Sequence, residues 1–121
     1  MGNILVIDDD PLNRRLLTAT LERQGHQTSS AEDGKTALAM LAEDRPDVVL
    51  LDLVMRGMYG LDVLEKLRQL DPSVKVVVVS ADIQTSSQQL VGQAGAKAFI
   101  TKPFDREEIL GILDTVLAGA G

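Results

Sequence analysis

Short apolar runs alternate along the chain with segments in which apolar residues recur every three or four positions. The strongest runs are Ile4–Ile7, Val48–Leu51 and Val74–Val79, and they are rich in the β-branched residues that strands favour. They are apolar almost throughout rather than alternating, which is typical of parallel strands covered on both faces. We therefore expect strands there, with two weaker strands at Gln27–Ser30 and Ala98–Thr101.

Helical spacing of apolar residues fills the stretches between these strands. Asp10, Asp33 and Asp105 each precede such a stretch and are suited to cap a helix start. A loop is expected at Val54–Gly60. The first helix is expected to start at Pro11 and stop at Gly25, and the second to start at Gly34. A third is expected over 61–70, ended by Asp71–Pro72. A fourth is expected over Thr85–Gln93, and a fifth after Asp105.

The order of elements predicts an α/β fold. Strand and helix alternate five times, and short right-handed crossovers then give an open parallel sheet with helices on both faces. The 121 residues suit one domain, and no linker or repeat divides the chain. We therefore expect one domain over residues 1–121. Residues 118–121 read as a flexible tail, which is either a natural end or the stump of a longer protein.

The amino-acid composition excludes several classes of function. The chain has no cysteine, which excludes disulfides, thiolate metal sites and a cysteine nucleophile. The net charge of −6 argues against direct binding to nucleic acid. No apolar run is long enough for a membrane span and no signal peptide opens the chain, so a cytoplasmic location is expected. The single histidine, His26, is expected on the surface and away from the site.

Polar residues occupy the carboxyl ends of the expected strands. Asp8 and Asp9 follow the first strand, Asp52 the third, Ser80 the fourth and Lys102 the fifth. Ligand sites of open α/β sheets lie beyond these ends. Each residue alone has an ordinary interpretation, as a helix cap or a solvated turn. The joint pattern is specific, because separate strand ends would all have to match by chance.

Three carboxylates held close together repel one another unless a cation lies between them. A hard divalent ion resolves this repulsion, and Mg²⁺ suits a site of a few carboxylates and water. We expect Asp9 and Asp52 to bind Mg²⁺ directly beside the backbone carbonyl of Val54. Asp8 is expected to act through water.

An acidic pocket with Mg²⁺, a hydroxyl and an ammonium group suits a phosphoryl group. Lys102 and the metal would neutralise the phosphoryl oxygens, and Ser80 would donate a hydrogen bond to one of them. The central carboxylate, Asp52, is then the expected nucleophile and becomes an aspartyl phosphate.

Four stretches resemble the receiver domain of two-component response regulators, the chemotaxis-regulator-like family. They are ILVIDDDP, PDVVLLDLVMRGMYGLDVLEKLR, VVVVSAD and GAKAFITKPF, and the resemblance covers essentially the whole chain. It implies a doubly wound, five-stranded parallel sheet of order 2-1-3-4-5 with five helices, a flavodoxin-like three-layer sandwich. It also implies a cis bond before Pro103.

The resemblance further implies a phosphorylation-dependent switch rather than an ordinary enzyme. A histidine kinase or phosphotransfer protein would donate the phosphoryl group to Asp52, and slow autodephosphorylation would follow. Ser80 and Phe99 take the positions of the switch residues. The surface of the fourth helix, fifth strand and fifth helix would then change for a downstream protein or an attached output domain. A phosphatase is a further expected partner.

The loop after the phosphoacceptor departs from the family pattern. Arg56 replaces a usual proline and Tyr59 a usual acid. Both changes bear on recognition by a kinase or phosphatase rather than on the metal ligands. Val54 and Asp82 flank the expected phosphoryl position and bear on the approach of water.

Two other function classes fit part of the pattern. A haloacid-dehalogenase-type phosphatase would use Asp8 as nucleophile, with Asp8-x-Asp10 as its signature. No acid pair follows Lys102 at a strand end, where it could complete the metal site. The chain also has no room for a cap that selects the substrate, and Asp52 would have no role. A flavin-binding module would need a hydroxyl- and glycine-rich loop after the first strand, which this chain lacks.

Overall fold

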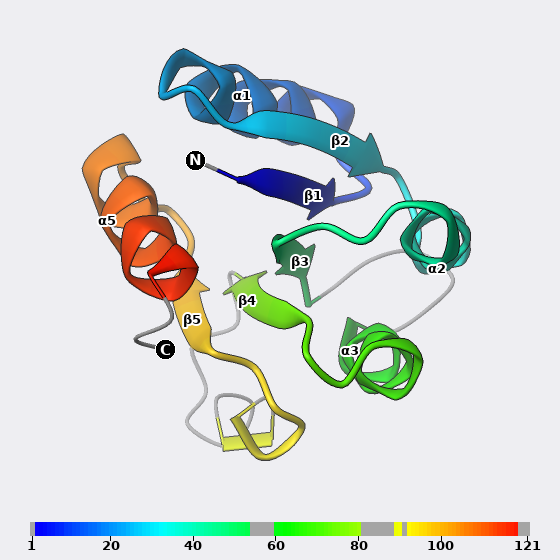
Figure 1. Ribbon diagram of the computed structural model, residues 1–121. Helices are drawn as coiled ribbons and strands as arrows, with labels where there is room; N and C mark the ends of the chain where they lie inside the picture. Colours follow the sequence, from blue (N-terminus) through cyan, green and yellow to red (C-terminus); the bar gives the residue numbers. More distant parts are fainter. Residues whose placement is uncertain (1, 54–59, 81–88, 91, 119–121) are drawn as a thin grey trace.

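The computed structural model describes residues 2–53, 60–80, 89, 90 and 92–118 (Figure 1). Within these residues there are five strands and four helices, which alternate along the chain except that β5 follows β4 in the order of described elements. The strands are β1 (Asn3–Ile7), β2 (Gln27–Ala31), β3 (Val48–Asp52), β4 (Lys75–Ser80) and β5 (Ala98–Thr101). The helices are α1 (Pro11–Arg23), α2 (Gly34–Glu43), α3 (Gly60–Leu70) and α5 (Arg106–Leu117).

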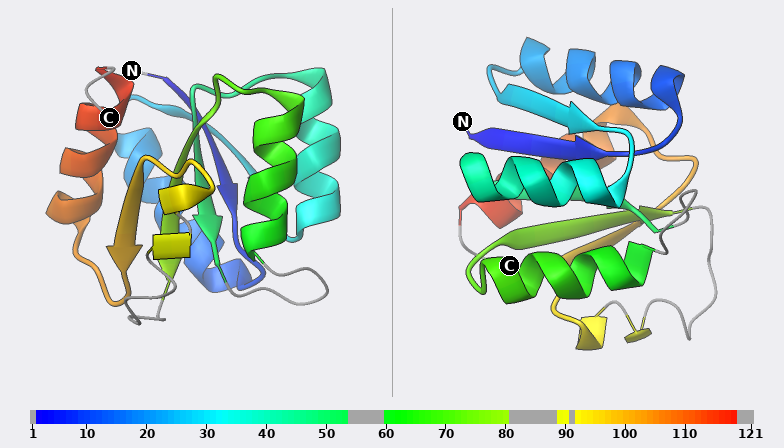
Figure 2. Two further views of the ribbon diagram at one scale, coloured as in Figure 1. Left: turned by 90° about the horizontal axis from the view of Figure 1, so that it is seen from below. Right: turned by 90° about the vertical axis from the view of Figure 1, so that its right-hand side faces the viewer.

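The strands form one sheet in the order β2-β1-β3-β4-β5, and all four pairings are parallel. The expected doubly wound α/β fold is therefore confirmed. All strands end at one edge of the sheet, as the arrowheads in Figure 2 show. We call this the carboxyl edge, and it is where the polar residues of the sequence pattern fall.

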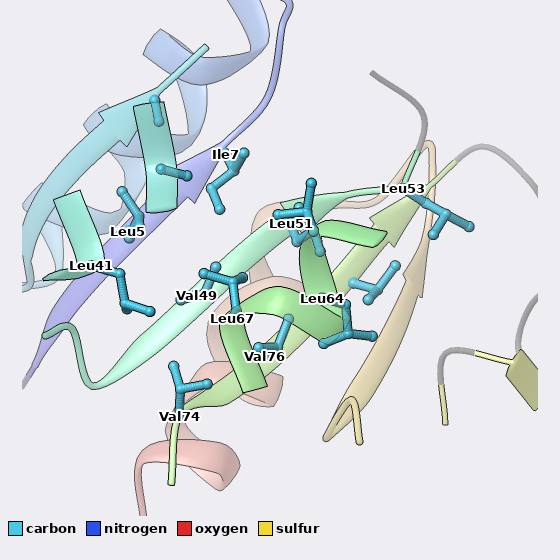
Figure 3. Packing of buried hydrophobic residues seen from close by; sticks show 14 residues of the cluster. Leu5, Ile7, Leu41, Val49, Leu51, Leu53, Leu64, Leu67, Val74 and Val76 are labelled. Carbon is cyan, nitrogen blue, oxygen red and sulfur yellow. The ribbon is translucent and has the colours of Figure 1, made fainter. Parts of the chain in front are cut away.

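Each face of the sheet is covered by a pair of helices, which gives three layers (Figures 1 and 2). One apolar cluster joins alternate strand residues to α2 and α3, and Figure 3 shows Leu5, Val49, Val76, Leu64 and Leu67 within it. The other cluster joins the remaining strand residues to α1 and α5. Because both faces are buried, the inner strands need apolar residues at every position, as the sequence pattern indicated.

The three expected helix caps are confirmed. Asp10 accepts a hydrogen bond from the Leu12 N–H at 3.0 Å. Asp33 and Asp105 each accept one from the N–H three residues later, at 2.7 Å in both cases. These bonds satisfy N–H groups that a helix start leaves without partners.

Two sequence-based expectations differ from the structure. Gly60, expected in a loop, is the first residue of α3, and its N–H donates to the Leu53 carbonyl at 2.7 Å. His26 is buried rather than on the surface, with 7% of its area exposed. Its Nδ1 accepts a hydrogen bond from the N–H of Gly2, the residue before β1, at 3.3 Å.

Parts of other expectations lie outside the described residues. Of the helix expected at Thr85–Gln93, residues 89, 90, 92 and 93 are helical and the remainder is not described. Of the expected tail at 118–121, Ala118 caps α5 and residues 119–121 are not described. Across the part of the chain that is described, no helix has the length and apolar character that crossing a bilayer requires.

Candidate metal and phosphoryl site

Three carboxylates meet at the carboxyl edge. One oxygen from each of Asp8, Asp9 and Asp52 lies within 4.8 Å of the others. β1 and β3 are neighbours in the sheet, so the residues that end them are brought together although they are more than forty positions apart. Asp8 is 3% exposed and Asp52 8%, so both carboxylates are largely removed from bulk water.

Lys102 reaches the same cluster from the end of β5. Its Nζ lies 3.4 Å from Asp52 Oδ2 and 3.5 Å from Asp8 Oδ2. Ser80 ends β4 and is fully buried. The Lys102 N–H donates to the Ser80 carbonyl at 2.8 Å, which fixes the two strand ends against each other. One cation therefore lies between two of the three carboxylates and offsets part of their mutual repulsion.

Two further residues of the site were missed by sequence reasoning. Asn13 Nδ2 donates to Asp8 Oδ2 at 2.6 Å, and an Arg14 guanidinium nitrogen donates to the Asp8 carbonyl, also at 2.6 Å. Both come from the start of α1, which turns back over the end of β1. In the sequence, the one feature that could have indicated their role is their position shortly after the acid pair Asp8–Asp9.

The remaining predicted residues lie away from the carboxylate cluster or outside the described part of the chain. Phe99 lies on β5 in register with Val78, is half-buried, and packs against the cluster under α2 and α3. Val54, Arg56, Tyr59 and Asp82 lie outside the described residues. The roles of the predicted site residues stay predictions. The Lys102–Pro103 bond is cis, as the resemblance implied.

The donor set suits a hard divalent cation. Carboxylate oxygens are the ligands that Mg²⁺ and Ca²⁺ take, and Mg²⁺ keeps several waters beside one or two carboxylates. Asp8, Asp9 and Asp52 provide such oxygens within one small volume. Histidine and cysteine are absent from the cluster, which disfavours zinc and other softer metals.

A groove of about 520 Å³ runs beside the cluster, between α1 and the segment that leads from β5 into α5. Asn13, Leu16 and Thr20 line it from α1, and Phe104 and Ile109 line it from the other side. Asn13 therefore belongs both to the groove and to the surroundings of Asp8.

A doubly wound parallel sheet with carboxylates, a hydroxyl and a lysine at its carboxyl edge defines a class of α/β proteins with a ligand site at that edge. The sequence model of the response regulator receiver domain matches residues 4–114. The chain belongs to this family, the receiver domains of two-component response regulators. Receiver domains are signalling domains rather than conventional enzymes.

Similar proteins differ in how much of their length the chain covers. Protein PilH of Pseudomonas aeruginosa is 36% identical over 98% of this chain and 100% of its own length. The probable transcriptional regulatory protein TcrX of Mycobacterium tuberculosis is also 36% identical, but the match covers 50% of it. A chain from the CheX–CheY–BeF3–Mg²⁺ complex of Borrelia burgdorferi superposes with a TM-score of 0.91, at 29% identity, over 94% of this chain and 87% of that one.

Proposed function

We propose that residues 1–121 form a single receiver domain in which Asp52 accepts a phosphoryl group. The observation that carries the proposal is the position of Asp52. It lies at the end of the central strand, within the carboxylate cluster and 3.4 Å from the Lys102 ammonium. A nucleophile in this position has a cation ready for the phosphoryl oxygens.

The transfer step needs no other nucleophile. An Asp52 oxygen forms a bond to phosphorus while the P–N bond of a phosphohistidine donor breaks, and the electron pair of that bond returns to the imidazole nitrogen. Lys102 and Ser80 then bind phosphoryl oxygens. Slow autodephosphorylation is attack of water on the same phosphorus, with Asp52 as the leaving group.

We propose Mg²⁺ as the cofactor, held by Asp9, Asp52 and the backbone carbonyl of Val54, with Asp8 acting through water. Bound there, Mg²⁺ would neutralise charge on the transferring group. The proposal is supported by the carboxylate cluster and by the Borrelia burgdorferi complex, which contains both BeF3 and Mg²⁺. BeF3 on a carboxylate stands in for a phosphoryl group.

The donor in this proposal is a histidine kinase or a phosphotransfer protein in the cytoplasm. Phosphorylation would draw Ser80 towards the phosphoryl group and allow Phe99 to turn inward. The surface around β5 and α5 would then change for a downstream protein, an output domain or a phosphatase. Such switches couple a local charge event to an element with two packing states.

Labelling with acetyl phosphate or beryllofluoride tests the assignment. We expect the unchanged protein to be modified only with Mg²⁺ present, and Asp52→Asn to lose the modification. Asp114→Asn, an exposed change on α5, is the matched control and should be modified normally. Modification of the Asp52→Asn protein at Asp8 would instead support the haloacid-dehalogenase-type reaction and overturn the proposal.

A further inference from the structure

The Asp8 side chain has protein donors on both of its oxygens. Oδ1 accepts from the Asp10 N–H at 2.9 Å. Oδ2 accepts from Asn13 Nδ2 at 2.6 Å and lies 3.5 Å from Lys102 Nζ. A carboxylate only accepts hydrogen bonds, so the amide nitrogen of Asn13 and not its oxygen must face it.

The Asp8 backbone is also held on both sides. Its N–H donates to the Ala31 carbonyl at 3.1 Å, and its carbonyl accepts from Arg14 at 2.6 Å. The carboxylate can still rotate about the two bonds of the side chain, and the last of these torsions has broad energy wells. The donors to the two oxygens therefore decide how the carboxylate is turned.

We propose that Asn13 is the positioning residue that turns the Asp8 carboxylate for metal binding. The proposal deepens the proposed function and rests on it. Of the three donors, the Asp10 N–H is fixed by the backbone, and Lys102 has a second carboxylate, Asp52, at a similar distance. Asn13 is the side chain that can be changed without altering charge or the phosphoryl contacts.

This arrangement also explains how Asp8 serves the metal. With both oxygens already accepting hydrogen bonds, Asp8 is suited to hold a metal-bound water rather than the ion itself. A neutral amide gives the required orientation without adding a fourth negative charge beside Asp9 and Asp52. Partners that orient residues around a metal typically change affinity by about 10–100-fold when they are removed.

The test compares Asn13→Leu, which keeps the side-chain size and loses the donor, with the unchanged protein. Calorimetry gives the Mg²⁺ affinity, and thermal unfolding without metal gives stability. We expect about tenfold weaker Mg²⁺ binding with a similar metal-free melting temperature. In the unchanged, metal-free protein, the Asn13 side-chain amide protons should exchange slowly with water, as measured by NMR.

Two further variants separate orientation from packing. Asn13→Gln keeps an amide donor on a longer arm and should recover part of the affinity. Thr20→Ala changes the same face of α1 and the same groove, two turns away, and should bind Mg²⁺ normally. If Asn13→Leu does not fold, Asn13→Ala takes its place.

Each outcome decides one of the two proposals. If the unchanged protein binds Mg²⁺ and the Asn13 variant binds it within twofold, the positioning role is wrong while the proposed function stands. Equal losses in Asn13→Leu and Thr20→Ala would make the effect one of helix packing and also overturn it. If the unchanged protein binds no Mg²⁺, the proposed function itself fails.

Discussion

The N–H of Lys102 donates to the carbonyl oxygen of Ser80 at 2.8 Å, across the ends of β5 and β4. The side chains of both residues are proposed to bind the phosphoryl group. This backbone bond joins their strands directly, so a pull on one side chain is transmitted to the other strand. It gives a physical route from Asp52 to β5, the strand that carries Phe99.

Ser80→Ala and Lys102→Ala should impair the response to phosphate more than its acquisition. The nucleophile and the carboxylate cluster remain in both variants, so Asp52 can still react. The contacts that Ser80 and Lys102 make to the phosphoryl oxygens form only once that group is present, and a ligand biases two states only through such a difference. Charge-assisted contacts contribute about 1.5–3 kcal/mol, enough for a tenfold shift in population.

NMR shifts between free and beryllofluoride-bound forms measure this response. We expect both variants to bind beryllofluoride with a reduced change around Phe99. If Lys102→Ala showed the same chemical-shift changes as the unchanged protein across residues 82–104, the proposed coupling between the phosphoryl group and Phe99 would be contradicted. The assignment of Asp52 as phosphoacceptor would still stand.

Asp9→Ala should weaken Mg²⁺ binding much more than Asp10→Ala. Asp9 contributes an oxygen to the carboxylate cluster, whereas the Asp10 side chain caps α1. Loss of this cap should lower the free energy of unfolding by about 1 kcal/mol. A metal titration and a denaturant titration on both variants test the division, and equal losses of metal affinity would disprove it.

Gly60→Ala should destabilise the fold, and Gly111→Ala should stabilise it. An added Cβ at Gly60 would lie 2.5 Å from the Leu53 Cα, so backbone must shift, at a cost of about 1–3 kcal/mol or more. At Gly111, within α5, an added Cβ meets no atom within 4 Å. There alanine should add about 1 kcal/mol through helix propensity. Denaturant unfolding of the two variants compares them directly, and a neutral Gly60→Ala would refute the close approach.

Acid should remove the contribution that the ionised Asp71 carboxylate makes to the free energy of unfolding. The pKa of this buried carboxyl is lowered from 3.8, chiefly because the Ser73 hydroxyl donates to it at 2.6 Å. Since the folded pKa lies below the unfolded one, the contribution is complete above the unfolded value and disappears as pH falls through the folded value.

Unfolding free energies measured between neutral pH and about pH 2 test this expectation. Asp71→Asn should be less stable than the unchanged protein at neutral pH and should converge with it in acid. Ser73→Ala should shift the Asp71 pKa back towards its usual value, as followed by carboxyl NMR. If the free energy of unfolding of Asp71→Asn changed with pH in the same way as that of the unchanged protein, the stabilising role assigned to the Asp71 carboxylate would be contradicted.

The sheet and most helices were predictable because local signals and burial agree. The run at Val48–Leu51 is apolar on both faces, and Asp10, Asp33 and Asp105 cap the helices that they precede. The predictions for His26 and Gly60 were wrong because the environments of these residues depend on residues that are distant in the sequence. Gly2, the residue before β1, donates a hydrogen bond to His26, and the backbone of Leu53 lies against Gly60.

The cluster of Asp8, Asp9 and Asp52 with Lys102 was predictable for a similar reason. Once the strands are parallel, their carboxyl ends must share an edge. The hydrogen bonds from Asn13 and Arg14 were not predictable, because they depend on how α1 turns back over β1. Side-chain directions of this kind follow from tertiary geometry rather than from spacing.

The packing beneath Gly2 has a practical consequence. An added Cβ there would lie 2.9 Å from Leu117 Cδ2, so the residue before β1 and the end of α5 meet at the edge of the sheet where the strands begin. A five-residue strand separates this edge from the acids by about 16 Å. A short linker between positions 2 and 117, with new ends opened elsewhere, would give a circular permutant that leaves every strand end of the site in place.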